Sequence, residues 1–141
     1  MPLNIIKLAV GIDDVEHLAE RQKRFKNSRG NFQHRTRMMP SRASEILPGG
    51  SMYWVIKRLI QVRQPIVAFH QEKDDNGRAF CMIEMEPKHF IVDATAKRPF
   101  QGWRYLKAED APADVRHGGK VYIDPKMPAD MKDELRRLGL L

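Results

Sequence analysis

The chain has 141 residues, of which 42% are hydrophobic and 30% charged, and its formal net charge is +7. This length and composition are typical of one folded domain and exclude a wholly disordered protein. A single cysteine excludes an internal disulfide and a multi-cysteine zinc site. We expect one domain over residues 1–141, soluble and cytoplasmic, because no stretch approaches the roughly 20 apolar residues of a spanning helix and no secretory signal is visible.

The first part of the chain predicts strands that alternate with short helices. Apolar, partly β-branched residues favour a buried strand, and an acidic cap followed by apolar residues at helical spacing favours a helix. The expected elements are, in order, a strand over 3–10, a helix after Asp13 or Asp14, a strand over 34–39 and a helix over 42–47 capped by Ser41.

The second part predicts consecutive strands joined by tight turns. They cover 51–57, 62–70, 79–85, 89–93, 99–106 and 120–123, and a helix over 131–138 closes the chain. Asp74-Asp75-Asn76-Gly77 is a strong hairpin-turn signal, and Pro65 indicates a bulge, an edge or a strand start. Mostly consecutive strands with few helices favour an α+β fold, a small and mostly antiparallel β-barrel with about three flanking helices.

The strand over 51–57 follows a double glycine and carries two aromatic residues. Strand alternation puts Trp54 on the core face and Tyr53 with Lys57 on the wetter face. Glycines permit a positive φ or a close backbone approach, so Gly49, Gly50 and Ser51 form a candidate ligand loop. A helix stop followed by a core strand explains the same residues equally well.

Positive charge is concentrated in one third of the chain. Residues 21–71 contain eleven lysines and arginines and one acid, Glu45. Such a field attracts polyanions, and phosphate neutralisation makes nucleic acid the favoured partner. We therefore expect these cations to converge on one electropositive surface. A solvated basic face without a partner is the alternative, and an anionic membrane is disfavoured because residues 21–30 offer only Phe25 as a bulky apolar residue.

The function that this pattern favours is an RNA-binding module that is not catalytic. No helix-turn-helix or zinc-finger pattern offers a major-groove reader, so unpaired RNA is preferred over duplex DNA. Aromatic side chains can stack on bases, although packing in the core is the favoured interpretation of the face that holds Trp103. The candidate nucleic-acid-binding residues are Arg35, Arg37, Lys57, Arg58 and Arg63 for phosphate, and Tyr53, Trp103 and Arg104 for an unpaired or modified base.

The common nucleotide-binding, hydrolase and metalloprotease motifs do not occur, so no catalytic residue, cofactor or metal is predicted. His70, His89 and Asp93 are the nearest alternative for a metal site assembled in space, and Cys81 reads as a buried, inert thiol. An enzyme for an anionic substrate at the Gly49–Gly50 turn is the rival hypothesis. Its acid or base would come from Glu45, His34 or His70. An adaptor that docks on an acidic protein is a third possibility.

Three segments carry a family resemblance: PLNIIKLAVG at 2–11, RASEILPGGSMYWVIK with VRQPI at 42–66, and RPFQGWRYLKAEDAP at 98–112. Together they resemble an uncharacterised bacterial family classed as a domain of unknown function, number 1489, which has no established activity. The Gly turn, the strand with Lys57 and the strand with Arg63 are similar at fold level to PUA-like barrels, including the ASCH and EVE domains. That likeness implies RNA binding or modified-base reading, although the glutamate of the ASCH motif is absent.

Overall fold

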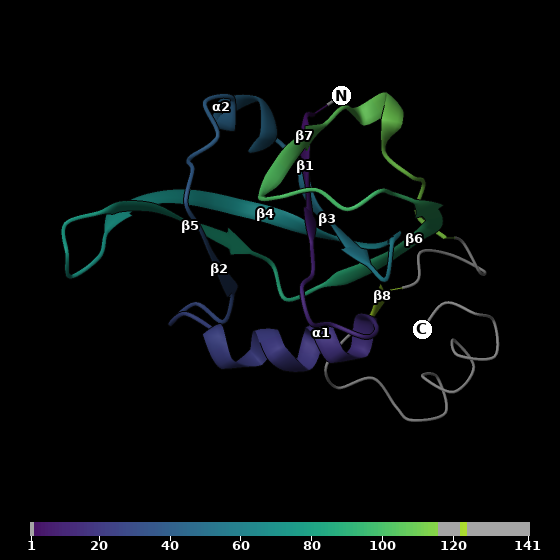
Figure 1. Cartoon of the computed structure of the whole chain (residues 1–141), viewed down its shortest axis with the longest axis horizontal. Coiled ribbons are helices and arrows are strands. Elements are labelled where there is room, and N and C mark those ends of the chain that lie inside the picture. The colour runs from purple at the N-terminus through teal and green to yellow at the C-terminus, as the bar shows by residue number, and fades with distance from the viewer. Residues whose placement is uncertain (1, 116–121, 124–141) are drawn as a thin grey trace.

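The computed structural model describes residues 2–115 and 122–123 (Figure 1). Its strands are β1 (Asn4–Leu8), β2 (Phe32–Thr36), β3 (Ser51–Ile56), β4 (Leu59–Lys73), β5 (Ala79–Met85), β6 (His89–Ala96), β7 (Trp103–Leu106) and β8 (Tyr122–Ile123). Its helices are α1 (Val15–Gln22) and α2 (Ala43–Ile46), with 3₁₀ turns η1 (Lys23–Phe25) and η2 (Ala108–Asp110). The described strands form one sheet in the order β2-β5-β4-β3-β1-β7, and β6 pairs with β4 and β8. All pairs are antiparallel except β1 with β3.

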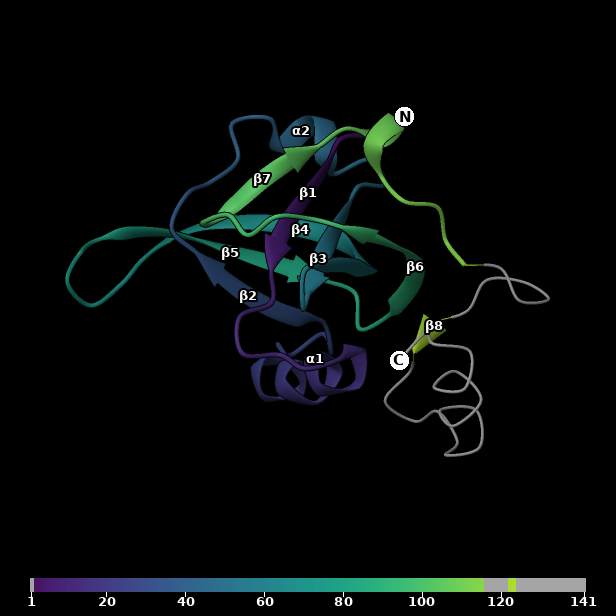
Figure 2. The ribbon, with the colours of Figure 1, turned by 45° about the vertical axis from the view of Figure 1, so that its right-hand side comes forward.

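The long strand β4 changes its partner near Pro65. Its first half pairs with β3 and β6, whereas its second half pairs with β5. The register shifts between Ile66 and Ala68, directly after Pro65, so of the bulge, edge or strand start that this proline indicated the structure has a bulge beside it. Bulges bend a strand and increase its twist, so the sheet curls around β4. The β4–β5 hairpin projects from the rest of the molecule in both ribbon views (Figures 1 and 2).

The predicted barrel is not closed by the strands that the structure describes. β2 and β7 stand at the two ends of the strand order. Side chains bridge these ends: Lys7 Nζ lies 3.4 Å from Thr36 Oγ1, and Trp103 Nε1 donates a hydrogen bond to the carbonyl oxygen of Met38. We call this contact region between β1–β7 and β2 the seam. The fold is a mostly β, strongly bent open sheet with few helices.

Both faces of the sheet are buried near β3. One apolar cluster includes Ile5 and Trp54, which is 2% exposed, and it confirms the predicted core position of Trp54. The second cluster, on the other face, includes Ile6, Tyr53 and Val92. Tyr53 is 6% exposed, so its expected place on a wet face is wrong. The sequence alternation predicted two faces correctly but could not show that Phe100 and Ala111, from later in the chain, pack against the second one.

Of the two helix caps that the sequence predicted, the structure has the one at the start of α1 but not the one at the start of α2. Asp14 caps α1 and accepts a hydrogen bond from the backbone N–H of His17 at 2.7 Å. Ser41 does not cap α2 with its side chain and lies instead 3.3 Å from the hydroxyl of Tyr105. The predicted helix over 131–138 lies outside the described residues. No helix in the described part of the chain is long and apolar enough to cross a bilayer.

Candidate nucleic-acid interface

The cations of residues 21–71 do not form one unneutralised surface. Within the described residues, six of the eleven lie in ion pairs, and three of these use carboxylates from the C-terminal half of the chain. Those three pairs are Arg29–Glu84, Arg35–Asp74 and Arg63–Asp114. The expectation of a single convergent basic patch is therefore corrected. The candidate site has to be sought where the remaining charge gathers.

Arg63 forms the most extensive of these ion pairs. It donates from Nε and Nη2 to the two carboxylate oxygens of Asp114, at 2.7 and 2.8 Å, and from Nη1 to Ser51 Oγ at 3.0 Å. Its guanidinium also lies 4.4 Å from the ring centroid of Phe90. The hydrogen bonds from Arg63 to Asp114 raise the pKa of the guanidinium, while burial raises the pKa of the neighbouring Tyr53 hydroxyl. Arg63 thus joins the sheet to the residue 114 segment, and little of the Arg63 or Tyr53 side chain faces solvent.

The candidate ligand loop at Gly49–Ser51 is occupied by the chain itself. A Cβ on Gly50 would collide with the backbone oxygens of Leu3 and Ile46, so this glycine is needed for close chain packing. The backbone N–H of Ser51 donates to Asn4 Oδ1 at 2.9 Å. These contacts favour the structural explanation of the double glycine.

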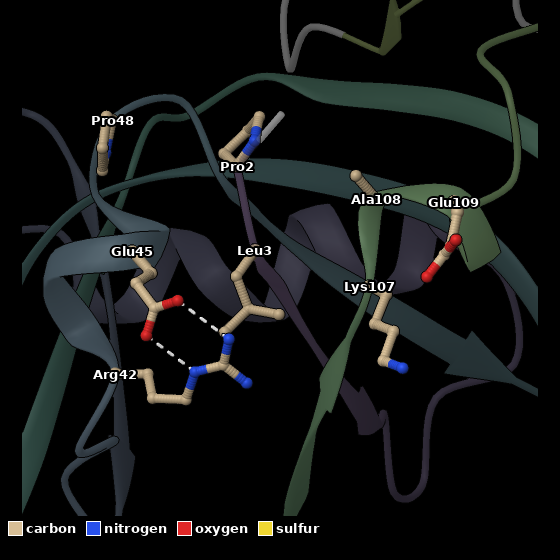
Figure 3. A pocket seen from close by; sticks show the side chains of 8 residues that line it. All are labelled: Pro2, Leu3, Arg42, Glu45, Pro48, Lys107, Ala108 and Glu109. Carbon is tan, nitrogen blue, oxygen red and sulfur yellow. Dashed lines mark hydrogen bonds and ion pairs between the residues drawn. The ribbon is translucent and has the colours of Figure 1, made fainter.

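An open hollow of about 760 Å³ lies beside this turn (Figure 3). Its lining includes Arg42 and Glu45, and Arg42 donates two hydrogen bonds to the Glu45 carboxylate at 2.7 and 2.8 Å. These hydrogen bonds lower the pKa of Glu45. A general acid or base near neutral pH needs a raised carboxyl pKa instead. Glu45 therefore gives no support to the enzyme hypothesis at this turn.

Three arginines gather around the C-terminal end of β2. An open hollow of about 720 Å³ is lined by Arg35, Arg37 and Arg78, with Asp74 as the acidic member of its lining. Arg35 stacks over Phe80, with its Cζ atom 3.9 Å from the ring centroid, and its Nη2 atom lies 3.6 Å from Asp74. Arg37 is exposed and has no carboxylate partner within the described residues. The hollow thus carries more positive than negative charge.

A second hollow, of about 510 Å³, adjoins the first. It is lined by residues that include Arg37, Gln101 and Trp103, and it shares Thr36 and Arg37 with the first hollow. The indole of Trp103 is held by its hydrogen bond to Met38 and by an edge contact with Tyr105. We call the two hollows together the Arg37 surface. It brings a predicted phosphate contact, Arg37, and a predicted stacking residue, Trp103, to one place.

The other predicted contacts lie elsewhere. Lys57 and Arg58 occupy the β3–β4 turn with φ values of 50° and 67°, and Lys57 Nζ lies 3.9 Å from Asp13. Arg104 is exposed, is not part of the lining of either hollow, and lies over the ring of Phe100. Sequence reasoning missed Arg78 and Gln101. Arg78 directly follows the Asp74–Gly77 turn, and the pairing of Thr36 with Cys81 brings the start of β5 beside the end of β2. The hairpin-turn signal, which sets where β5 begins, is the one that could have found Arg78.

The histidines of the alternative metal site have separate partners. His70 Nε2 donates to Glu84 at 2.9 Å, and His89 Nε2 contacts Gln22 Oε1 at 2.6 Å. Among the described residues, no group of three or more histidine, cysteine or acidic side chains could hold a metal ion. Cys81 is fully buried, as expected, and burial raises the pKa of its thiol to about 11.

Comparisons with known proteins place the chain in a family but assign it no activity. No curated protein and no solved structure matches it, so the likeness to PUA-like domains stays a prediction. A family model does match over residues 5–141, which is nearly the whole chain and covers all or most of each segment that carried the resemblance. The chain belongs to the family described as "Protein of unknown function (DUF1489)".

Proposed function

We propose that this protein is a nucleic-acid-binding module that holds unpaired RNA along the Arg37 surface. One observation carries the proposal: Arg37 and Trp103, which come from distant parts of the sequence, line the same hollow. A cation next to an aromatic ring is the combination that single-strand binding uses, because the cation contacts the backbone and the ring stacks on a base.

The phosphate contacts in this proposal are Arg35, Arg37 and Arg78. Guanidinium groups match phosphate oxygens in a bidentate geometry that a lysine cannot copy. Arg37 has no acidic partner among the described residues, so phosphate can reach it without first breaking an ion pair. Arg35 is 57% exposed at its side chain and its contact with Asp74 is long, at 3.6 Å, which leaves its outer edge available.

The base contact in this proposal is Trp103. Its ring is fixed on two sides, by the 3.0 Å hydrogen bond to Met38 and by Tyr105, whose ring centroid lies 5.0 Å away. A ring that is already fixed loses little entropy when a base stacks on it. Thr36 and Gln101 also line this hollow and offer hydrogen-bonding groups to the edge of an unpaired or modified base.

We also propose that the fold is a PUA-like barrel that is not fully closed. The bent sheet, whose end strands contact each other through side chains at the seam, supports this assignment. Function does not follow from such a likeness. The RNA-binding proposal therefore stands on the Arg37 surface alone.

The test compares two single-arginine variants in a titration of a fluorescent oligouridine of about 12 nucleotides, a length that covers one binding site. Arg37→Gln should weaken binding and lower the salt slope of log K by about 0.7, the value for one phosphate contact with a single strand. Arg58→Gln removes the same charge from the β3–β4 turn and serves as the matched control. It should leave the slope unchanged.

Two outcomes contradict the proposal. Equal losses for Arg37→Gln and Arg58→Gln would indicate generic attraction of a polyanion to a basic protein. Equal affinity for an RNA duplex and for the single strand would exclude a role for an unpaired base. Titrations between about 50 and 200 mM salt separate these cases, because phosphate contacts dominate the salt dependence.

A further inference from the structure

A separate and more enclosed pocket lies between α1 and the strands β1, β2 and β3. Its volume is about 220 Å³. Its apolar wall includes Ala9, Ile12, Leu18, Phe25 and Trp54. The volume is below the roughly 300–1,000 Å³ of pockets for drug-sized ligands, so an occupant would be a small molecule.

The charged groups of this pocket are both cations. Lys7 and Arg21 line it, and no acidic side chain does so among the described residues. Lys7 is half-buried, and burial lowers the pKa of its ammonium group. Its Nζ atom has three N–H donors, whereas the hydrogen bond it makes is a long one to Thr36 Oγ1, at 3.4 Å. A partly buried cation without a counter-charge is unfavourable, so an anion beside Lys7 would relieve a cost already present in the fold.

Arg21 brings the second positive charge to the edge of the same pocket. Its Nη1 atom lies 3.6 Å from the position that a Cβ on Gly11 would occupy, so the guanidinium extends from α1 over the β1–α1 connection. Arg21 is exposed and has no carboxylate partner in the part of the chain that the structure describes. Its planar fork suits a carboxylate or a similar oxyanion.

His34 adds an uncharged aromatic wall. Burial, with a smaller contribution from Lys7, lowers the pKa of this imidazole to about 4, so it is neutral at neutral pH. Its ring meets Trp54 edge-on at a centroid distance of 5.1 Å. The indole of Trp54 and the aliphatic side chains provide an apolar surface next to a positively charged one.

We propose that this pocket binds a small organic anion, with its anionic group on Lys7 and Arg21 and its apolar body against Ile12, Leu18 and Trp54. The proposal does not depend on nucleic-acid binding, because these residues do not line the Arg37 surface. Charge complementarity selects an anion over a neutral or cationic molecule. The enclosed apolar wall selects an organic ion over an inorganic one.

The test is a titration of the ¹⁵N-labelled full chain, followed by NMR, with three probes. Benzoate has both the anionic group and the apolar body, benzyl alcohol lacks the charge, and acetate lacks the ring. Benzoate should shift the signals of Gly11, Gln33 and the Trp54 indole N–H. It should bind at least about tenfold more tightly than benzyl alcohol, because a hydrogen bond to a charged group contributes that much or more. It should also bind more tightly than acetate, which has no ring to bury against the apolar wall.

Two variants locate the anion. Lys7→Met keeps the length of the side chain and should weaken benzoate about tenfold or more while leaving benzyl alcohol unchanged. Arg21→Gln changes an exposed residue and should weaken benzoate without affecting folding. Lys97→Met, at an exposed lysine that does not line the pocket, is the matched control and should bind benzoate like the parent chain.

The proposal is overturned if benzoate and benzyl alcohol bind equally well, because the cations would then have no role. It is also overturned if the shifted signals lie outside the pocket. A loss of benzoate binding in Lys97→Met equal to that in Arg21→Gln would likewise exclude a defined anion site.

Discussion

Gln22 of α1 and Gln64 of β4 exchange two hydrogen bonds in the protein interior, at 2.9 and 3.1 Å. The indole N–H of Trp54 also donates to Gln64 Oε1, and Gln64 Nε2 donates to the carbonyl oxygen of Glu86. An indole N–H only donates and a carbonyl only accepts, so these two contacts fix the orientation of both amides. His89 Nε2, 2.6 Å from Gln22 Oε1, must then carry a proton. One helix and three strands are thereby tied to a single polar network.

Gln64→Leu should destabilise the protein by about 2–4 kcal/mol, because it removes the acceptor of the buried amide nitrogen of Gln22 and of the indole N–H of Trp54. The free energy of unfolding is measured by urea denaturation. Gln71→Leu, at an exposed position of the same strand, should change it by no more than about 0.5 kcal/mol. Similar values for the two variants would contradict a structural role for the network.

Glu84 is buried, with a side chain that is 0% exposed, and receives hydrogen bonds from Arg29, Asn31 and His70. Burial alone would raise its pKa, but hydrogen bonds led by that from Asn31 more than offset burial and lower the pKa to about 2. A carboxyl group with a lowered pKa in the folded state stabilises the protein above its unfolded pKa. This stability is lost as the pH falls from 4.5 toward 2.

Glu84→Gln should therefore flatten the dependence of unfolding free energy on pH between about 4.5 and 2. At neutral pH the variant should be about 2 kcal/mol less stable, since it loses hydrogen bonds to a charged group. Urea denaturation at a series of pH values measures both effects. An unchanged slope in this window would show that Glu84 titrates normally in the folded protein.

His34 should give a second and separate pH dependence. Its pKa is about 4 in the folded protein against an ordinary value of 6.5, so the unfolded chain binds a proton that the folded chain does not. Stability should fall as the pH drops from 6.5 to 4, by on the order of 3 kcal/mol for a shift of this size. His34→Gln should remove the decline in this window and leave the lower window of Glu84 intact. NMR titration of the imidazole gives the pKa directly, and a value near 6.5 would exclude the effect.

Local signals in the sequence predicted the order of the elements, but several bounds were wrong: the strand expected over 34–39 is Phe32–Thr36, and the one expected over 62–70 is Leu59–Lys73. The Asp74–Gly77 turn forms as expected, with Asp74 Oδ1 accepting from the backbone N–H groups of Asn76 and Arg78 and with Gly77 at φ +76°. β5 has the predicted bounds, and Trp54 is in the core. Each of these features depends on residues close together in the chain.

Pairings between distant residues could not be predicted in the same way. Arg63 and Asp114 are 51 positions apart, and Arg29 and Glu84 are 55 apart. Which cation is neutralised depends on strand order and bending, and neither leaves a periodic pattern in the sequence. For this reason the count of cations overstated the basic surface, whereas Arg37 has no carboxylate partner among the described residues.

Arg63→Gln should separate a structural role from a role in binding. It breaks the two hydrogen bonds to Asp114 and should lower the free energy of unfolding by about 2–3 kcal/mol, the range for hydrogen bonds to charged groups. Its affinity for oligouridine, measured well below the unfolding transition, should match that of the parent chain. A loss of affinity with unchanged stability would instead restore Arg63 as a phosphate contact.

Trp103 should report RNA binding through its fluorescence. The chain has two tryptophans, and Trp54 is 2% exposed, so a base that stacks on Trp103 should quench the exposed part of the emission. Trp103→Leu should remove this quenching and weaken binding of oligouridine by about 1–3 kcal/mol, the contribution of one stacked base. Trp103→Phe keeps a ring in the hollow and should retain most of the affinity. If Trp103→Leu binds oligouridine as tightly as Trp103→Phe does, the indole of Trp103 has only a packing role against Tyr105. The phosphate contacts alone would then account for any binding of RNA to the Arg37 surface.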